Sequence, residues 1–417
     1  MAIGDLYLEL SRVLALIRCE HTKANLPKGL EARRKVEPTY LPFRFVLFDG
    51  RMYVDRPGPG TGLTRGDEVV ALDGRPIAQL LAEVEPLIPV DGDTDEVKRL
   101  EIAYSNELMG PGLDHFAPFL HPLHKMVEVR ATRDGKTRVL KIPRLTYPEF
   151  LEVAGEQGRY ASNFKTAVRF DRLGKEGAYL AVDTFVNYRD PVDPMAVFGK
   201  IFHTLKKEGR SKLIVDLRRT GGGSDDVPVA LFRHLIAKPS RHRAELRVQT
   251  LTYDAELRAH IDTWDKSALD PDPKDFEALP RGGFRMKLDP ATLIYPPAPN
   301  AFAGELMILV GPVNASGATH LLAALDLAER GLRVGEATGG APSGATAGVI
   351  FFVALPESGI SVRLPVQRTI MAGAEELPQR RGLAPDVAAP MTAADYFAGR
   401  DPALAAAKAR LGLGATP

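Results

Sequence analysis

The sequence predicts a layered α/β core, preceded by a smaller β-rich module and an N-terminal helix. From Tyr179 onward, short apolar runs typical of β-strands alternate with segments of helical periodicity, as in folds whose strands are joined by crossover helices. Between residues 36 and 148, strand and turn signals follow one another without that alternation. The chain has 417 residues, of which 45% are hydrophobic, so it can bury more than one core. We expect three units, at residues 1–35, 36–148 and 149–417.

The first unit begins with a helix. Its apolar positions share one broad helical face; they are Leu6, Leu8, Leu10, Val13, Leu14, Leu16 and Ile17. The polar stretch from Arg18 to Lys23 ends this helix and forms a histidine-containing turn. Asp5 and Glu9 interrupt the apolar pattern, so the segment does not resemble a signal peptide.

The β-rich module is clearest at its turns. A turn at residues 65–67 leads into a strand from Glu68 to Leu72. A second hairpin runs from Val127 to Ile142 and reverses at Asp134 and Gly135. Between these hairpins lies a polar, partly helical insert, residues 91–124, to which the sequence assigns no position.

The predicted elements of the core follow in a regular order. They are a strand at 178–185, a helix near Pro194–Lys207, a strand at 212–217, a helix near Asp226–Ala237, a strand at 307–311 with its helix, a strand at 361–366 and a final helix at 395–411. The segment 254–300 is rich in proline and charge, and we expect it to cross the surface of the core.

Composition excludes several classes of function. The net charge of +1 and the lack of long charged blocks give no electrostatic reason to expect nucleic acid or an anionic membrane as a partner. Nothing in the chain is long and apolar enough to span a bilayer. The single cysteine, Cys19, excludes an intramolecular disulfide and a multi-cysteine zinc site. We therefore expect a polypeptide-like substrate, no cofactor and no metal.

Two strand–loop–helix units predict an acyl-transfer site. They are KLIVDLRRTGGGSDD (212–226) and ELMILVGPVNASGATHLLAAL (305–325). Small residues at such turns leave backbone N–H groups unpaired, where they can hold an oxyanion. Ser316 lies at one turn, and Gly221 to Gly223 form the other. The alternative interpretation of Ser316 is a helix N-cap whose hydroxyl accepts a backbone hydrogen bond.

Four stretches of the core resemble one known family. DLRRTGGG, NASGATHLLAAL, RVGEATGG and GLAPDV occur in the order and spacing of motifs in the C-terminal processing (tail-specific) serine peptidases, including the tricorn-core and interphotoreceptor retinoid-binding relatives. The resemblance extends from about Val13 to Leu411, and the stretch from Gly62 to Ile77 is similar to a degenerate PDZ domain.

The resemblance implies a ClpP/crotonase-like layered core with a PDZ-like domain. It places Ser316 as the nucleophile of a serine peptidase that hydrolyses extended or unfolded polypeptides through an acyl-enzyme. The oxyanion donors would be the N–H of Gly317 and one from Gly221 or Gly222. The carboxylate of a bound peptide would meet N–H groups near Gly62, Leu63 and Gly66.

The identity of the base departs from the bacterial pattern. No lysine occurs between Ser316 and Ala407, so the Ser–Lys dyad of many bacterial members is excluded. CEHTKANLP matches the histidine turn of the tricorn-like branch, which makes His21 the expected base. The alternative is that His21 has only a structural role at a helix C-terminus, where the helix dipole favours a histidine.

The remaining site assignments stay open. The resemblance implies an orienting glutamate near GLAPDV, for which the chain offers Glu375 and Glu376. His320, four residues after Ser316 on the same helix face, is the alternative base. Two other functions fit the same scaffold, namely a non-catalytic protein that binds a peptide or an apolar ligand, and an acyl-CoA enzyme. The resemblance implies export or the cell envelope if a leader precedes this sequence, and otherwise the cytoplasm.

Overall fold

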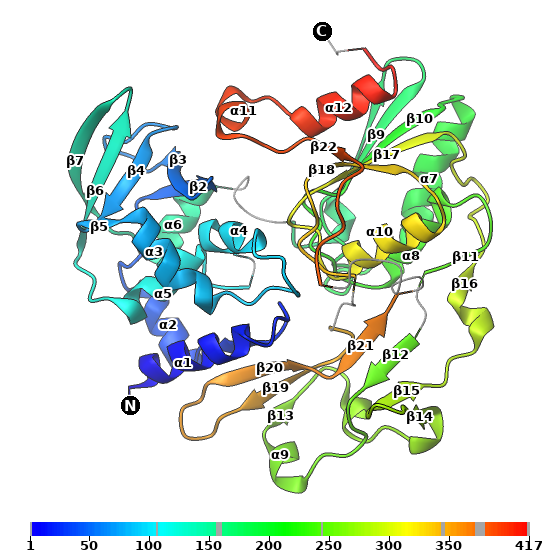
Figure 1. Cartoon of the computed structure of the whole chain (residues 1–417), viewed down its shortest axis with the longest axis horizontal. Coiled ribbons are helices and arrows are strands. Elements are labelled where there is room, and N and C mark those ends of the chain that lie inside the picture. The colour runs from blue at the N-terminus through cyan, green and yellow to red at the C-terminus, as the bar shows by residue number, and fades with distance from the viewer. Residues whose placement is uncertain are drawn as a thin grey trace.

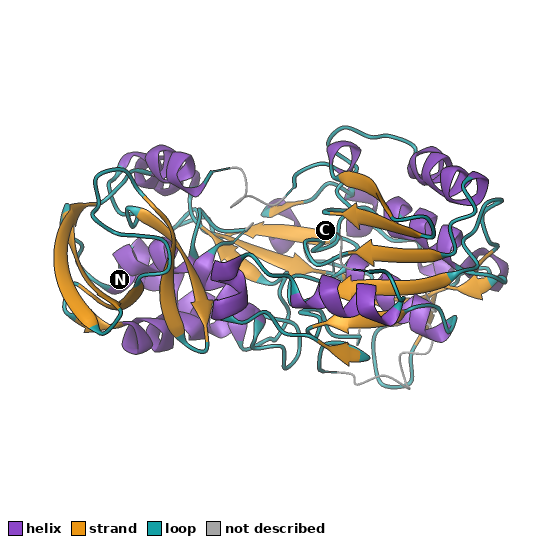
Figure 2. Cartoon of the chain, turned by 90° about the horizontal axis from the view of Figure 1, so that it is seen from above, coloured by secondary structure: helices purple, strands orange, loops and turns teal. Residues whose placement is uncertain are grey.

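The computed structural model describes residues 2–105, 107–155, 161–242, 245–342, 347–371 and 380–414. The β-rich module and the N-terminal helices lie on one side of the molecule, and the larger α/β core lies on the other (Figure 1). Figure 2 shows helices on both faces of the core strands. The predicted α/β fold with a β-rich module and an N-terminal helix is confirmed.

The N-terminal segment joins the module to the core. Helix α1 (Ile3–Ala15) buries Tyr7, Leu8 and Leu14 against the module, as its apolar periodicity predicts. Strand β1 (Lys23–Asn25) then pairs antiparallel with β20 (Ser361–Pro365). Helix α2 (Lys28–Val36) follows. The chain therefore attaches its first segment to a strand that lies near its other end.

The β-rich module is one antiparallel sheet in the order β2-β3-β4-β6-β7, with β5 paired to β4. Its strands are β2 (Phe43–Phe48), β3 (Arg51–Pro57), β4 (Glu68–Leu72), β5 (Arg75–Pro76), β6 (Met126–Arg133) and β7 (Lys136–Pro143). The predicted strand and the predicted hairpin are both confirmed. Asp134 and Gly135 have positive φ at the hairpin turn, a conformation that Asp tolerates and Gly favours.

Four helices cover this sheet: α3 (Ile77–Val84), α4 (Val97–Ala103), α5 (Gly112–Leu120) and α6 (Tyr147–Ala154). Two of them, α4 and α5, form the insert that the sequence left without a position. They pack against β2, α1 and α3, and their apolar residues join the same core as the sheet. The insert is therefore part of the module and faces the α/β core.

The α/β core is built on a sheet in the order β22-β18-β17-β10-β9-β8. Its strands are β8 (Val168–Leu173), β9 (Gly177–Val182), β10 (Lys212–Asp216), β17 (Glu305–Val310), β18 (Leu332–Gly335) and β22 (Val387–Ala388). Neighbouring strands are parallel except β8 and β9. Parallel strands need crossover connections, which accounts for the alternation seen in the sequence.

Helices cover both faces of this sheet. Leu213 and Val215 of β10 point to the face covered by α7 (Pro194–Lys207), α8 (Asp226–Leu235) and α10 (Gly317–Leu327). Ile214, between them, points to the opposite face and packs with α12 (Pro402–Arg410). A parallel strand buried on both faces reads as a continuous apolar run, as KLIVDL does.

The segment 254–300 does more than cross the surface of the core. It forms α9 (Ala255–Ala259), β13 (Ile261–Asp262), β14 (Phe276–Ala278), β15 (Phe284–Met286) and β16 (Ile294–Tyr295). These elements pair in small sheets with β11 (Ser240–Arg241), β12 (Glu245–Val248), β19 (Ile350–Ala354) and β21 (Gln367–Ile370). One of these sheets, β1-β20-β19-β13, is the sheet that holds the N-terminal strand.

The prediction of one final helix is wrong. Two helices occur, α11 (Ala393–Ala398) and α12, because Gly399 takes a left-handed conformation (φ 68°) that ends the first. In α11, the Tyr396 hydroxyl donates to Asp55 of β3 (2.8 Å), so this short helix fastens the core to the module. None of the helices in the described ranges is long and apolar enough to cross a membrane.

A buried carboxyl in α5 predicts how stability depends on pH. Asp114 accepts a hydrogen bond from the Leu41 N–H (2.6 Å), and burial raises the pKa of this carboxyl to about 7. The protonated form is stable in the folded chain, so the stability it contributes is present below the unfolded pKa of about 4 and is lost as the pH rises toward about 7.

We expect Asp114→Asn to remove this dependence, because an amide keeps the acceptor oxygen and cannot ionise. When the pH is raised from about 4.5 to about 8, the free energy of unfolding of the wild type should fall by roughly 3 kcal/mol more than that of the variant. Urea unfolding at both pH values measures it. Asp134→Asn, at an exposed turn, is the control and should follow the wild type. If the free energy of unfolding of Asp114→Asn depended on pH as that of the wild type does, Asp114 would not be the cause of the dependence.

Candidate active site

The two predicted loops meet at one edge of the core sheet. Strands β10 and β17 are parallel neighbours, so the loops that follow them leave the sheet side by side. Asn314, fully buried, holds the loops together. Its amide nitrogen donates to the carbonyls of Leu217 (2.5 Å) and Thr220 (3.1 Å), and its oxygen accepts from the Gly311 N–H (2.9 Å). The relative position of the two loops is thus fixed by hydrogen bonds.

Ser316 occupies a strained turn before α10. Its φ of 47° and ψ of −125° lie where residues with a Cβ rarely occur. Holding such a conformation costs about 1 to 3 kcal/mol and is typical of functional sites. The hydroxyl does not cap the helix, so the N-cap interpretation of this serine is wrong. The side chain is partly exposed and available to react.

The glycine loop lies directly against this serine. A Cβ placed on Gly222 would be 2.9 Å from the Ser316 Cβ and 3.1 Å from the Gly317 nitrogen. Among the described residues, the N–H groups of Gly221, Gly222 and Gly317 donate to no other backbone or side-chain acceptor. Unused N–H groups beside a serine are the components of an oxyanion hole. Glycine is required at position 222 because any side chain would separate the two loops.

The other two motifs close the same site. The Gly340 N–H donates to the Asn314 carbonyl (2.8 Å), and a Cβ on Gly340 would lie 2.2 Å from the Thr319 Oγ1. Thr338 is joined to Leu383 through its N–H (3.1 Å) and through its hydroxyl, which accepts from the Leu383 N–H (2.8 Å). All four motifs singled out in the sequence therefore converge around the turn at Ser316.

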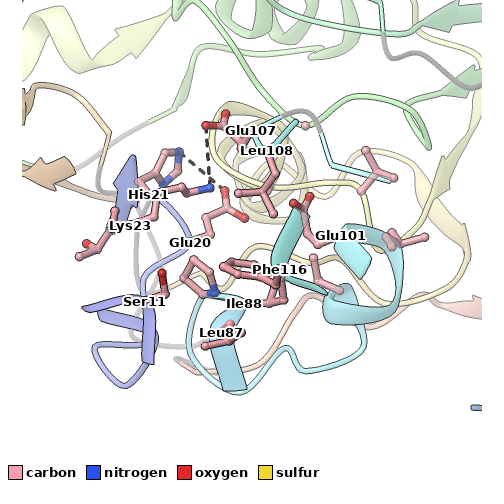
Figure 3. Close-up of a pocket in the computed structure, with 18 of the residues that line it drawn as sticks. Ser11, Glu20, His21, Lys23, Leu87, Ile88, Glu101, Glu107, Leu108 and Phe116 are labelled. Carbon is pink, nitrogen blue, oxygen red and sulfur yellow. Dashed lines mark ion pairs between the residues drawn. The ribbon is translucent and has the colours of Figure 1, made fainter. Parts of the chain in front are cut away.

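His21, from the N-terminal segment, lines a cavity next to the two core loops. It lies beyond the end of α1, in a turn in which the Thr22 N–H donates to the Cys19 carbonyl (3.1 Å), so it is not a C-terminal helix residue. A cavity of about 140 Å³ is lined by His21 and, from the two core loops, by Gly221, Pro312, Val313 and Ala315. Figure 3 shows His21 and Lys23 at this cavity, opposite Glu107.

The surroundings of His21 keep its imidazole neutral. Burial, reinforced by the positive charges of Lys23 and Arg363, lowers the pKa of His21 to about 3, although Glu107 acts in the opposite direction. A neutral imidazole has one nitrogen with a free lone pair and can accept a proton from a serine hydroxyl. His21 is therefore in the charge state that a general base needs, although the lowered pKa also makes this imidazole a weaker base.

Lys23 and Arg363 both form ion pairs with Glu107, and Lys23 and Glu107 line the cavity. The Lys23 Nζ lies 3.8 Å from the Glu107 Oε2, and Arg363 of β20 pairs with the same carboxylate. Burial opposes ionisation of Glu107, but the two cations lower the pKa of Glu107 to about 2. The amine of Lys23 is engaged in this cluster, so we assign it an electrostatic role.

The orienting group of His21 is only partly defined. The His21 Nε2 lies 3.7 Å from the Glu20 Oε1, and burial followed by the charge of Asp91 raises the pKa of Glu20 (Figure 3). Within the described ranges, the His21 Nδ1 is buried and has no hydrogen-bond partner. Glu375 and Glu376, the carboxylates that the resemblance implies, lie outside the described residues. Their role stays a prediction.

The alternative base faces another cavity. The His320 N–H donates to the Ser316 carbonyl (3.1 Å), as expected for residues four apart on a helix. Its side chain, however, lines a separate cavity of about 200 Å³ together with Asp225, Asp226 and His242. The structure thus places His320 and His21 in different cavities.

Two of the three N–H groups predicted to hold a peptide carboxylate already donate hydrogen bonds within the module. The Gly66 N–H donates to the Val54 carbonyl (2.7 Å), and the Leu63 N–H to the Thr61 hydroxyl (3.3 Å). Near Gly66, a Cβ would lie 3.7 Å from Phe397 of α11. A carboxylate at Leu63 and Gly66 would have to displace these internal contacts, and the role of Gly62, Leu63 and Gly66 in peptide binding stays a prediction.

Sequence reasoning missed several residues of the site. Asn314 lies inside a quoted motif, and its position before a nucleophile turn was the available signal. Glu20 and Lys23 flank His21 in the chain, but nothing local indicates that they face a cavity. Glu101 and Glu107 come from the insert, which the sequence could not place. Their roles depend on partners far away in the chain.

Comparison with known proteins agrees with this geometry. Residues 176–389 match Peptidase family S41. Among solved structures, the chain is similar to mature CPAF, with a TM-score of 0.63 and 16% identity over 94% of this chain and 84% of that one. Mature CPAF complexed with lactacystin gives a TM-score of 0.63 and 17% identity over 99% and 89% of the two chains. At this identity the likeness shows a shared fold. A search of curated proteins found no match.

The family match spans more than half of the chain. It includes the turn at Ser316, the glycine loop and the two strand ends that close around them, whereas His21 lies before it. The strained serine and the unused N–H groups are what hydrolysis by a serine nucleophile requires. The chain therefore belongs to peptidase family S41 and is a serine peptidase of the C-terminal processing type.

Proposed function

We propose that this peptidase cleaves extended or unfolded polypeptides through an acyl-enzyme on Ser316, with His21 as the base. The observation that carries the proposal is the contact of Gly222 with Ser316 and Gly317, next to a cavity that is lined by His21 and by the chain neighbours Gly221 and Ala315. It supports a serine, two amide donors and an imidazole acting together. Neither the base nor the oxyanion donors follow from family membership alone.

In the mechanism, His21 acts first as general base and then as general acid. His21 accepts the proton of the Ser316 hydroxyl as the oxygen attacks the scissile carbonyl, and the carbonyl oxygen becomes an oxyanion. The N–H groups of Gly317 and Gly222 stabilise that charge. His21 then returns the proton to the leaving amine. Water, activated by the same imidazole, hydrolyses the acyl-enzyme and regenerates the serine.

The cavity beside His21 suits an apolar side chain of the substrate. Its wall includes Leu87, Ile88, Val97, Leu100 and Phe116, all contributed by the module and its insert. Burying an apolar side chain there would be favourable by about 1.5 to 3 kcal/mol. An extended chain presents its side chains one by one, whereas a folded substrate keeps its apolar residues inside. The cavity therefore favours unfolded polypeptides.

A non-catalytic binding protein on the same scaffold is the second candidate. The observation that favours it is the His21 Nδ1, which has no hydrogen-bond partner in the part of the chain that the structure describes. A base whose ring is not oriented by an acceptor loses much of its efficiency. The experiments below separate the two candidates because they detect the reactive serine itself.

Replacement of the nucleophile gives the first test. A fluorophosphonate probe should label the wild-type chain at one site, and Ser316→Ala should abolish the label, because only an activated serine reacts with such probes. Cleavage of a fluorogenic unfolded polypeptide should fall by roughly a thousandfold or more in the same variant. Intact-protein mass spectrometry locates the label. A wild-type chain that neither reacts nor cleaves at any pH would favour the binding protein.

Two histidine variants distinguish the candidate bases. We expect His21→Gln to lower the rate of fluorophosphonate labelling by about 10² to 10⁴-fold, because the seryl proton then lacks an acceptor. His320→Gln, whose side chain lines the other cavity, should change the rate by less than about tenfold. Thermal unfolding of both variants checks that they are folded. The reverse order of effects would make His320 the base.

The glycine loop can be tested with a matched pair of variants. Gly222→Ala places a methyl group 2.9 Å from the Ser316 Cβ, and Gly135→Ala meets no atom within 4 Å, although both glycines have positive φ. Each should lose about 1 to 2 kcal/mol of stability from backbone strain. Only Gly222→Ala should lower peptidase activity, by about a hundredfold or more, because the oxyanion donors are displaced. If the two variants were equally active, Gly222 would not contribute to the oxyanion hole.

A further inference from the structure

Three potential metal ligands lie together on the far side of the His21 turn. Cys19, His21 and Asp91 each offer one ligand atom, and these atoms lie within 4.8 Å of one another. A thiolate, an imidazole and a carboxylate are the donor types that zinc prefers. No metal was expected from the sequence because its only cysteine excludes a multi-cysteine zinc site, and Cys19 and Asp91 are far apart in the chain. Their proximity is a product of the fold.

The two segments that carry these ligands are held in place by a dense set of hydrogen bonds. The Glu20 N–H donates to the Asp91 Oδ1 (2.9 Å), and the Gly92 N–H donates to the Arg18 carbonyl (3.0 Å). The Arg18 guanidinium binds both oxygens of Asp95 (3.0 and 2.8 Å). The ligand positions therefore require little ordering when an ion binds.

One of the ligands has an unsatisfied nitrogen. The His21 Nδ1 is buried and has no hydrogen-bond partner among the described residues, and the side chain is only 15% exposed. Leaving a buried polar atom without a partner costs about 1 to 3 kcal/mol. A metal ion coordinated through the Nδ1 of this ring would recover that cost. The observation is independent of the cluster itself and points to a ligand at this place.

We propose that Cys19, His21 and Asp91 bind a divalent zinc-like cation. Zinc bonds of about 2.0 to 2.3 Å place neighbouring tetrahedral ligands about 3.3 to 3.7 Å apart, so small side-chain rotations close the site. The thiol of Cys19 loses its proton to water on binding. Water occupies the fourth position, as is common for sites with three protein ligands.

Binding at this site inhibits the peptidase, a consequence that rests on His21 being the base. A neutral imidazole has a single nitrogen lone pair, and the other nitrogen carries the proton. A metal ion uses that lone pair whichever nitrogen it binds. The ring then has no lone pair with which to accept the proton of Ser316. The metal and catalysis compete for one residue.

Cobalt spectroscopy tests binding without any need for catalysis. We would titrate the full-length Ser316→Ala chain with Co²⁺ and expect a thiolate-to-cobalt charge-transfer band in the near ultraviolet that saturates at one equivalent. Because Cys19 is the only cysteine of the chain, this band can arise only from Cys19. Zn²⁺ should abolish the band by displacing cobalt. Absence of the band at saturating Co²⁺ would overturn the proposal.

Variants then identify the other ligands. Cys19→Ser should remove the charge-transfer band, and Asp91→Asn should weaken Zn²⁺ binding by about tenfold or more in equilibrium dialysis. Asp93→Asn, an exposed carboxylate of the same loop, is the matched control and should bind Zn²⁺ like the parent chain. Should Cys19→Ser bind Zn²⁺ as tightly as the parent, the metal lies elsewhere and the assignment is wrong.

Inhibition is measured separately in the active chain. Zn²⁺ should inhibit cleavage, a chelator should restore it, and Cys19→Ser should keep its basal activity with at least about tenfold lower sensitivity to Zn²⁺. A chain that binds cobalt through Cys19 yet shows no peptidase activity would support the metal site and refute the proposed function. A chain whose inhibition by Zn²⁺ is unchanged by Cys19→Ser would refute the inhibitory role of the site.

Discussion

The parallel pairing of β10 with β17 is the constraint on which the rest of the site depends. Because both strands end at the same edge of the sheet, their loops must share a small space, and the buried amide of Asn314 fixes how they do so. Only glycine at position 222 lets the loops touch. The strained backbone of Ser316 is held by this packing, since the conformation would relax in an isolated turn. The positions of the proposed nucleophile and of the proposed amide donors thus follow from one contact between strands.

The proposed base is delivered by a different and longer-range interaction. Strand β1 adds to the edge of β20, with Lys23 opposite Arg363, and carries the turn of His21 to the cavity. Glu107 of the insert pairs with both cations, so three distant segments meet around the imidazole. The N-terminal segment, the insert and the small sheets beside the core therefore fix the position of His21 together.

Burial around His21 has two consequences that act in opposite directions. It keeps the imidazole neutral, which suits proton acceptance, and it leaves the Nδ1 without a partner, which suits a metal ion. Cys19 and Asp91 each place one ligand atom within 4.8 Å of a ring nitrogen of His21. The same buried imidazole can therefore act either as a general base or as a metal ligand. It cannot do both at once, because each use needs its lone pair.

The local pattern of the sequence was enough for the main parallel strands of the core, for the helices between them, and for the turns that hold Ser316 and the glycine loop. These features are encoded by apolar periodicity, by small residues at turns and by motifs a few residues long. The position of the insert at 91–124 could not be predicted from the sequence. One helix was predicted where α11 and α12 occur, although Gly399 between them is a signal for a helix end. The sequence by itself was enough to propose Ser316 as the nucleophile and to predict the turn that holds it. Only the tertiary structure decided what surrounds His21, because its charged neighbours and the carboxylate of Asp91 come from distant segments that no local pattern connects.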